Sequence, residues 1–332
     1  MSEYRELRYK VNKKDGAVTA GEIMRDTLHL SSREVSRCKQ FEDGVMVVRD
    51  SETSSEYSSM NVGEKSFGNE GDFVVSDTSK SVPIRLIDRL SPGDVLIVRI
   101  YEDNDNAGDI VPTEGAIDIV YEDEDLIVLN KEGDRVVHPS YAHYTDSLSN
   151  FLAGYYKKTG QRHVIRTIGR LDRETSGLVI FAKNRHSAAL LSKQTSDMSR
   201  RKEYLAICSG VFEEKEGTVD APIRRKPDER MIREVHHEGK TAITHYKVEK
   251  QYDDYALVRL KLDTGRTHQI RVHMAFLGHP LIGDNFYADK EAKSYGLTRA
   301  ALHAASIEFI HPITCDKIIV EAKVPDDMRR LL

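Results

Sequence analysis

Short blocks of β-branched and aromatic residues, bounded by Gly, Pro, Asp or Asn, recur along residues 116–332 and predict strands rather than long helices. The first two, within 116–131, are joined by an acidic turn and predict a hairpin. Further strands are expected at 177–184, 202–212, 242–250, 255–262, 303–312 and 317–325, and helices at 185–198 and 268–278. Because turns join the strands as often as helices do, the pattern predicts an α+β fold with a mixed, mainly antiparallel sheet flanked by helices and loops.

The N-terminal region shows a different pattern. Ile23, Leu28 and Leu30 are roughly helically spaced, Ser31 and Ser32 are N-cap candidates for a second short helix at 32–41, and a turn and strand follow at 43–48. A later strand with a Gly-Asp turn is expected at 90–102. This order resembles the small αL RNA-binding module, an α/β unit first described in a small-subunit ribosomal protein. The resemblance implies RNA contacts by three basic residues on or near one side of the second helix, Arg33, Arg37 and Lys39.

Composition changes suggest where the domains meet. A chain of 332 residues exceeds the usual size of one domain. We predict an RNA-binding module at 1–105, interrupted at 51–80 by a flexible insertion rich in Ser, Gly and acidic residues. The acidic, Pro-containing stretch 106–115 is the predicted linker, and 116–332 the second domain.

Charge is unevenly distributed along the chain. The net charge is −5, but residues 1–115 carry −7 and the remainder +2, with basic clusters that could follow a phosphate backbone; solvated surface faces are the alternative for any single cluster. No apolar run is long enough to span a bilayer, and the charged start does not resemble a secretory signal, so we expect a cytoplasmic protein without a membrane partner. Cys38, Cys208 and Cys315 are expected to be buried and reduced. Nothing indicates an obligate interface, so a monomer is expected.

The stretch 168–184 carries the clearest candidate chemistry. Arg170, Asp172, Arg173 and Glu174 stand beside a Thr-Ser-Gly turn, immediately ahead of an apolar strand. Such a turn can orient a carboxylate through hydroxyls and backbone N–H groups, and neighbouring arginines favour its ionised form. An oriented, ionised Asp can act as a nucleophile or general base. A structural salt bridge explains this motif equally well when it is taken alone.

Three ordered motifs resemble those of the RluA-type pseudouridine synthases, RNA enzymes that isomerise uridine. Residues 169–184 resemble the H-R-L-D-x-x-T-S-G-L signature, 200–210 the K-x-Y motif, and 262–284 the G-R-T-H-Q-I-R-V-H segment; 302–312 fits a later strand. The resemblance spans about 120–332. Gly169 stands where the family usually has His, which puts in doubt the contacts made beside the flipped base.

The resemblance also implies roles for individual residues. Asp172 would be the catalytic aspartate, Arg266 would pair with it and keep it ionised, and Tyr204 would stack on the uracil and later take a proton. A phenol suits that last role only if its pKa is lowered. Arg170, with Arg173 nearby, would contact the RNA, Arg170 entering the space left by the flipped nucleotide. Arg271 would contact phosphate or brace the site.

Other interpretations were weighed. The triplet Asp263-Thr264-Gly265 occurs in aspartic proteases, but no second copy is present. His268, His273 and the His236-His237 pair lack the spacing of a metal site, and no nucleotide-binding motif is found, so neither a metal nor a cofactor is expected. A non-catalytic RNA-binding protein is the main rival, yet a carboxylate among phosphates would repel its ligand. By the same resemblance, large-subunit ribosomal RNA is the favoured substrate and transfer RNA the alternative.

Overall fold

The computed structural model describes residues 4–16, 18–49, 81–102, 110–197, 199–289 and 293–332. The chain forms two compact units. The smaller unit comprises Met1–Gly108, Asn184–Leu190 and His311–Asp316, and the larger unit comprises Asp109–Lys183, Leu191–Ile310 and Lys317–Leu332. The predicted insertion at 51–80 and positions 106–109 of the predicted linker lie outside the described residues. The domain boundaries and the αL assignment stay predictions.

The smaller unit contains a four-stranded antiparallel sheet and short helices. The sheet order is β1 (Tyr4–Lys10), β6 (Val95–Tyr101), β3 (Val45–Val48) and β4 (Val82–Pro83). The remaining elements are η1 (Lys13–Asp15), β2 (Val18–Thr19) paired with β5 (Arg89–Leu90), α1 (Ala20–Glu22), the π-helical turn η2 (Ile23–Thr27) and α2 (Ser32–Cys38). Ser31 caps α2: its hydroxyl accepts from Glu34 N, and the Glu34 carboxylate accepts from Ser31 N at 2.8 Å. The predicted N-cap and second helix are therefore confirmed.

The basic residues predicted for this unit lie on and just after α2. Arg33 and Lys39 are exposed, whereas Arg37 is half-buried. The opposite side of α2 supplies Val35 and Cys38 to a core shared with Leu7, Val47 and Leu96 from the sheet. The helix is thus amphipathic, with an apolar face on the sheet and exposed cations away from it.

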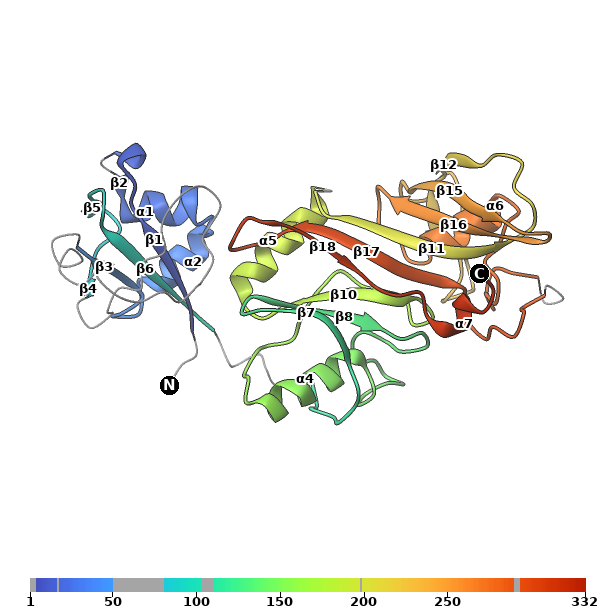
Figure 1. Cartoon of the computed structure of the whole chain (residues 1–332), viewed down its shortest axis with the longest axis horizontal. Helices are drawn as coiled ribbons and strands as arrows, with labels where there is room; N and C mark the ends of the chain where they lie inside the picture. Colours follow the sequence, from blue (N-terminus) through green and yellow to red (C-terminus); the bar gives the residue numbers. More distant parts are fainter. Residues whose placement is uncertain (1–3, 17, 50–80, 103–109, 198, 290–292) are drawn as a thin grey trace. The chain divides into compact units, whose positions relative to one another are not determined.

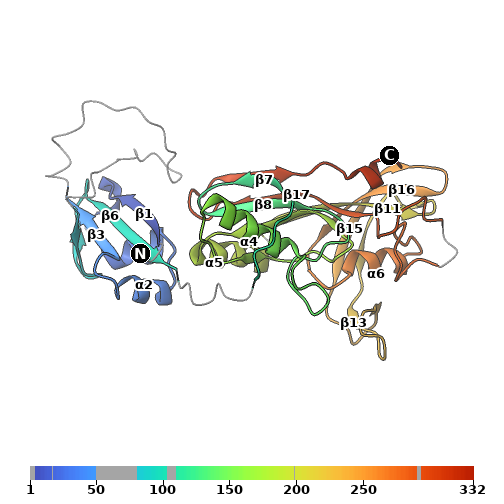
Figure 2. The ribbon, with the colours of Figure 1, turned by 90° about the horizontal axis from the view of Figure 1, so that it is seen from below.

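A ten-stranded sheet forms the larger unit (Figures 1 and 2). Its order is β12 (Glu216–Asp220), β15 (Ile243–Gln251), β16 (Tyr255–Leu262), β11 (Arg201–Ser209), β17 (Leu302–Ile310), β10 (Ser176–Ala182), β8 (Leu126–Lys131) and β7 (Asp118–Glu122). β18 (Lys317–Glu321) pairs with β17, and β9 (Arg166–Ile168) with β10. Among the described strand pairs of this sheet, β10–β17 is parallel and the others are antiparallel. The predicted α+β fold with a mixed, mainly antiparallel sheet is confirmed.

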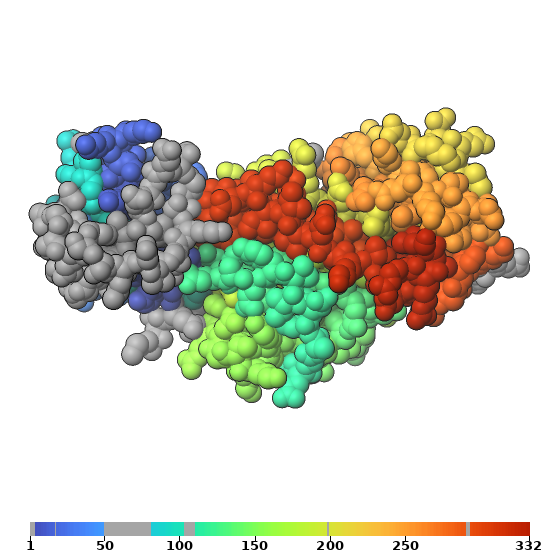
Figure 3. Space-filling model, viewed as in Figure 1, coloured from blue at the N-terminus to red at the C-terminus, as the bar shows by residue number. Residues whose placement is uncertain are grey.

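The sheet brings distant parts of the sequence together. On the face seen in Figure 3, the C-terminal residues (red) lie beside the first strands of this unit (teal), and β18 contacts β7. A small hairpin, β13 (Ile223–Arg225) and β14 (Arg233–Val235), lies outside the main sheet.

Four helices accompany the sheet: α4 (Leu148–Thr159), α5 (Arg185–Ser196), α6 (Gln269–Phe276) and α7 (Asp326–Arg329). α5 and α6 were predicted, whereas α4 and α7 were not. α4 packs Leu148, Leu152 and Tyr156 into the core that also holds Val179 and Phe181 of β10. Every residue of β10 is buried, so this strand is a fixed support for the turn that precedes it.

Gly177 allows β10 to approach β17 closely. Its φ is +110°, and a Cβ at this position would lie 2.3 Å from the carbonyl oxygen of Ala304. Only glycine fits both the backbone conformation and the contact. The close contact of Gly177 with Ala304 therefore fixes the end of the Thr-Ser-Gly turn against β17.

The cysteine prediction is corrected at one position. Cys38 and Cys208 are buried free thiols, but Cys315 is exposed, at φ +59° in the turn between β17 and β18, where no core lies over it. Within the described residues, no helix is both long and apolar enough to cross a bilayer. The predicted cytoplasmic location and monomeric state stay predictions.

Candidate active site

Asp172 lies in the turn between β9 and β10. The residue is half-buried, and its main-chain carbonyl accepts a hydrogen bond from Thr175 N at 3.2 Å. Its carboxylate makes no hydrogen bond or ion pair within the described ranges. The backbone is fixed while the carboxylate stays available to a ligand.

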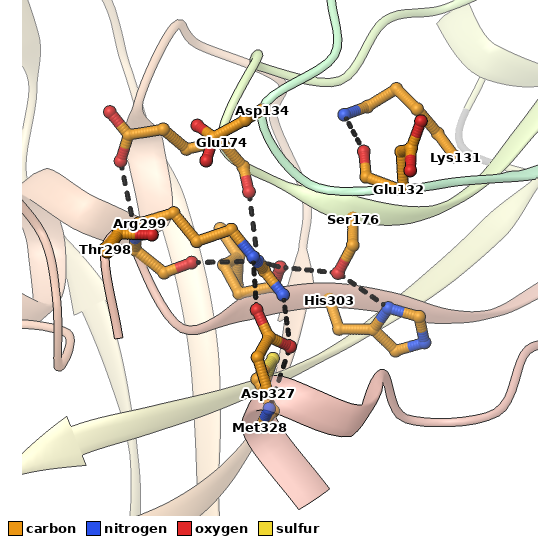
Figure 4. A network of polar contacts seen from close by, with 12 residues as sticks. Lys131, Glu132, Asp134, Glu174, Ser176, Thr298, Arg299, His303, Asp327 and Met328 are labelled. Carbon is orange, nitrogen blue, oxygen red and sulfur yellow. Dashed lines mark hydrogen bonds and ion pairs between the residues drawn. The ribbon is translucent and has the colours of Figure 1, made fainter. Parts of the chain in front are cut away.

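Two buried cations bind main-chain oxygens of this turn, at residues 173 and 174. Figure 4 shows these cations, Lys131 and Arg299, together with Glu174. Lys131 Nζ donates to the carbonyl oxygens of Arg173 at 2.9 Å and Glu132 at 2.7 Å. Arg299 Nη1 donates to the Glu174 carbonyl at 3.0 Å, while its other nitrogens bind the Asp327 carboxylate of α7 at 2.7 and 2.9 Å. Burial lowers the pKa of Lys131 to about 7, and the charge of Arg299 adds to this shift. Cations that donate to carbonyls can fix a turn without neutralising a nearby carboxylate.

The Glu174 side chain links the turn to Arg271. Glu174 Oε2 accepts from Ala300 N at 3.0 Å and lies 3.1 Å from Arg271 Nη2. Arg271, only 1% exposed, also binds the Asp284 carboxylate with two nitrogens, each at 2.6 Å. Its guanidinium carbon lies 5.2 Å from the Phe286 ring centre, one of two aromatic rings beside it.

Arg271 is also within electrostatic reach of Asp172. Burial lowers the pKa of Arg271, but its hydrogen bonds to Asp284 and the negative charges of Asp284, Glu174 and Asp172 outweigh that effect and raise the pKa. The guanidinium therefore stays charged in a buried position. It provides the positive charge that the sequence interpretation had assigned to a different arginine.

The predicted ion pair between Arg266 and Asp172 is not formed. Arg266 is exposed, its Nε donates to the Thr241 carbonyl at 2.9 Å, and no ion pair with Asp172 occurs among the described residues. Arg266 lies in the loop before α6, whose N-cap His268 has φ +59°, whereas Arg271 lies inside the helix and is buried. Of these two arginines, Arg271 is the buried one and the one whose pKa responds to the charge of Asp172.

Tyr204 is nearly buried on β11 and lines a partly open cavity of about 430 Å³, a size common for ligand sites. The other lining residues come from β11, β15, β16, the loop after β16 and the end of α5: Thr195, Arg200, Arg201, Lys202, Glu203, His245, Lys261, Leu262, Asp263, Thr264 and Gly265. Burial raises the pKa of Tyr204; Asp172 adds to this shift and Arg200 opposes it. Burial therefore does not supply the lowered pKa that the proton-accepting role requires, and both roles of Tyr204 stay predictions.

The remaining predicted RNA contacts lie on the surface of the same turn. Arg170 and Arg173 are both exposed, and Arg173 Nε is 3.9 Å from Asp134 Oδ1. Neither is held in the core, so both can reach a ligand above Asp172. Their binding of RNA stays a prediction.

Sequence reasoning missed the bracing residues Lys131, Arg299 and Asp327. Lys131 ends an apolar strand and Arg299 precedes an alanine-rich stretch, and a charged residue in such a position is a signal of a buried, paired cation. Asp327 gave no comparable signal, since its importance comes from the tertiary contact with Arg299.

The other weighed motifs have local explanations. The Asp263 carboxylate accepts a hydrogen bond from His245 Nε2 at 2.8 Å. Both His273 ring nitrogens are bound, to Thr244 Oγ1 at 2.8 Å and Ala221 O at 2.9 Å. His236, His237 and Glu238 do place possible ligand atoms within 4.8 Å of one another, but the Glu238 carboxylate already binds Arg224 at 2.8 Å.

Comparison with known proteins agrees with the three motifs. Residues 125–276 match the family described as RNA pseudouridylate synthase. A Bacillus subtilis protein named uncharacterized RNA pseudouridine synthase YjbO is 40% identical over 243 residues, covering 73% of this chain and 84% of that protein. The ribosomal large subunit pseudouridine synthase D of Blochmanniella floridana is 36% identical over 259 residues, covering 72% and 80%.

A solved structure agrees with the fold. Human RNA pseudouridylate synthase domain containing 1 matches with a TM-score of 0.54 at 27% identity, covering 64% of this chain and 86% of that one. The family match includes Asp172, Tyr204 and Arg271, all of which lie in the larger unit. The chain therefore belongs to the RNA pseudouridylate synthase family, of the RluA type, and is an RNA pseudouridine synthase.

Proposed function

We propose that Asp172 is the nucleophile that attacks a uridine flipped out of its stack, and that the substrate is large-subunit ribosomal RNA. One observation carries the assignment of Asp172: its carboxylate is unpaired within the described structure, yet the turn that bears it is braced by Lys131, Arg299 and Glu174. A carboxylate with a fixed backbone and a free side chain is suited to attack a bound substrate.

The proposed chemistry is an isomerisation that needs no oxidant or reductant. A carboxylate oxygen of Asp172 bonds to C1′ of the ribose, the C1′–N1 bond breaks, and its electron pair stays on N1 of the detached uracil. The uracil turns so that C5 faces C1′. The C5–C1′ bond then forms as the aspartyl–C1′ bond breaks, and the proton on C5 is finally lost while N1 gains one.

Arg271 and Tyr204 support this sequence in different ways. Arg271 places a buried positive charge near the attacking carboxylate, without a direct bond that would hold Asp172 away from C1′. Tyr204 offers its ring at the cavity wall, where it stacks on the detached base and retains it. Arg170, exposed beside the turn, fills the space that the flipped nucleotide leaves.

The choice of RNA rests on relatives and on the smaller unit. Relatives named for the ribosomal large subunit, from Blochmanniella floridana and Haemophilus influenzae, are 36% and 37% identical to this chain. They favour ribosomal over transfer RNA. In the smaller unit, the exposed cations Arg33 and Lys39, with Arg37 beside them, would grip structured RNA outside the site of chemistry.

Asp172→Asn tests the nucleophile. The substitution keeps volume and removes the attacking charge, so the fold and RNA affinity should persist while tritium release from 5-tritiated uridine in ribosomal RNA stops. Asp263→Asn is the matched control, because Asp263 also lines the cavity wall but is paired with His245, and its release should continue. Undiminished release by Asp172→Asn would show that another group performs the attack.

A further inference from the structure

Three consecutive cations lie at the start of β11: Arg200 directly before the strand, and Arg201 and Lys202 as its first two residues. All three line the cavity that contains Tyr204, and none forms an ion pair within the described part of the chain. The carboxylates that line the same cavity each already bind a basic side chain. Glu203 binds Lys261 at 2.7 Å and Asp263 binds His245 at 2.8 Å. The cavity thus has an excess of positive charge that the protein itself does not neutralise.

Two of these cations are partly withdrawn from solvent. Arg200 and Lys202 are half-buried, and burial lowers the pKa of each. Lys202 Nζ also lies 5.5 Å from the centre of the Tyr204 ring. Desolvating a cation without a counter-charge is unfavourable, so such a pair is expected where a ligand brings the missing negative charge.

Gly169 gives Arg200 its position. Gly169 has φ +80°, and a Cβ there would lie 3.0 Å from Arg200 Nη2, so the guanidinium occupies the space beside the glycine. Arg200 Nη1 donates to the Ile168 carbonyl at 3.0 Å. Arg200 therefore joins the cavity to the turn that carries Asp172, at the position where the family usually has a histidine side chain.

We propose that Arg200 and Lys202 form a binding site for a backbone phosphate of the RNA strand that flanks the target uridine. This inference rests on the proposed function, since it places the phosphate beside the Asp172 turn. The planar guanidinium fits two phosphate oxygens, and the lysine adds a compact charge next to the stacking ring. The absence of a side chain at Gly169 leaves room for the Arg200 guanidinium beside the Asp172 turn.

The experiment measures RNA affinity without turnover. Arg200→Gln and Lys202→Gln are each made in Asp172→Asn protein, and the dissociation constant for in-vitro transcribed large-subunit ribosomal RNA is followed against salt concentration. Each substitution should reduce the slope of log affinity against log salt by roughly 0.7–0.9 and weaken binding by about tenfold. Lys158→Gln, at the exposed end of α4 and outside the cavity, is the charge-matched control and should change neither by a comparable amount.

Equal slopes for the two cavity variants and the control would overturn the proposal. Arg200→Lys distinguishes loss of charge from misfolding. It keeps the positive charge, so the salt slope should persist, while affinity should fall because the planar guanidinium is lost. Circular dichroism melting verifies that each variant is folded. Wild-type protein that forms no pseudouridine in this RNA would overturn the proposed substrate alone, because the salt slopes are measured independently of turnover.

Discussion

Arg271→Met examines the buried charge that we assign to the active site. The side chains of Arg271 and Asp284 are 1% and 0% exposed, and two hydrogen bonds of 2.6 Å join them. Removing the arginine leaves a buried carboxylate without its partner, which costs about 3–5 kcal/mol. For a chain of this size, we expect the melting temperature to fall by roughly 10 °C. Circular dichroism melting measures this loss.

The double variant Arg271→Met/Asp284→Asn separates stability from catalysis. Asn retains an oxygen that can accept from Phe286 N and Tyr287 N, as Asp284 Oδ1 does at 2.9 and 3.2 Å, and no buried charge remains at position 284. Glu174 loses its ion pair with Arg271 but keeps the hydrogen bond from Ala300 N. We therefore expect the double variant to recover much of the lost melting temperature. Single-turnover pseudouridine formation should stay about 100-fold or more below wild type, because the positive charge near Asp172 is still missing.

A double variant with wild-type activity would refute this reasoning, since Arg271 would then serve the fold alone. Arg266→Met is the second comparison. Arg266 is exposed and donates to a main-chain carbonyl, so its loss should change the free energy of unfolding by about 0.5 kcal/mol or less. Loss of the chemical step in Arg266→Met, together with an active double variant, would restore Arg266 as the charge partner.

Three further changes have definite expected outcomes. Gly177→Ala should lower the free energy of unfolding, measured by chemical denaturation, by about 3 kcal/mol or more, because φ is +110° and a backbone oxygen lies 2.3 Å from the new methyl. Gly160→Ala, with open space around it, should lower it by about 1–2 kcal/mol. Burial lowers the pKa of His303 to about 4, so the unfolded chain binds one proton more than the folded chain between pH 6.5 and 4. The free energy of unfolding of the wild type should therefore fall by about 3 kcal/mol across that range, and that of His303→Gln should not show this loss. Asp327→Asn should reduce kcat about tenfold with KM unchanged, because it loosens Arg299 and, through it, the turn that bears Asp172. Asp327→Glu should restore part of kcat. Equal activity of the wild type and both variants would exclude this positioning role.

Much of the larger unit's sheet could be predicted because its strands are apolar blocks bounded by turn residues. β10 is the clearest case, since all seven of its residues are buried. α4 was missed although Leu148, Leu152 and Tyr156 recur at helical spacing. The capping box of α4 pairs Ser147 with Asn150, whereas the usual sequence signal has Glu or Gln at the second position. In addition, the basic residues at the end of α4 led us to interpret this stretch as a charged cluster and not as a helix.

The turn that bears Asp172 was predicted, and Arg271 was expected to contact phosphate or brace the site, but the charge beside Asp172 was assigned to Arg266. Arg266 and Arg271 belong to one motif, and sequence spacing does not show which of them faces the core. The answer depends on where α6 begins: His268 adopts a left-handed conformation, the helix starts at Gln269, and Arg271 is carried into the interior. A shift of one residue in that boundary would turn a different side chain inward.

The bracing of the Asp172 turn explains why so many charges are buried around it. Lys131 and Arg299 are 1% and 4% exposed, and each donates to a main-chain oxygen of the turn instead of to the Asp172 carboxylate. A lysine whose pKa falls to about 7 destabilises the fold at neutral and lower pH, since the unfolded chain holds that proton more tightly. An apolar residue would avoid this loss but could not bind two carbonyl oxygens. At Lys131 the fold therefore gives up stability to hold the turn that bears Asp172. When Lys131 is replaced by an apolar residue, the stability of this region and the rate of the chemical step should change in opposite directions.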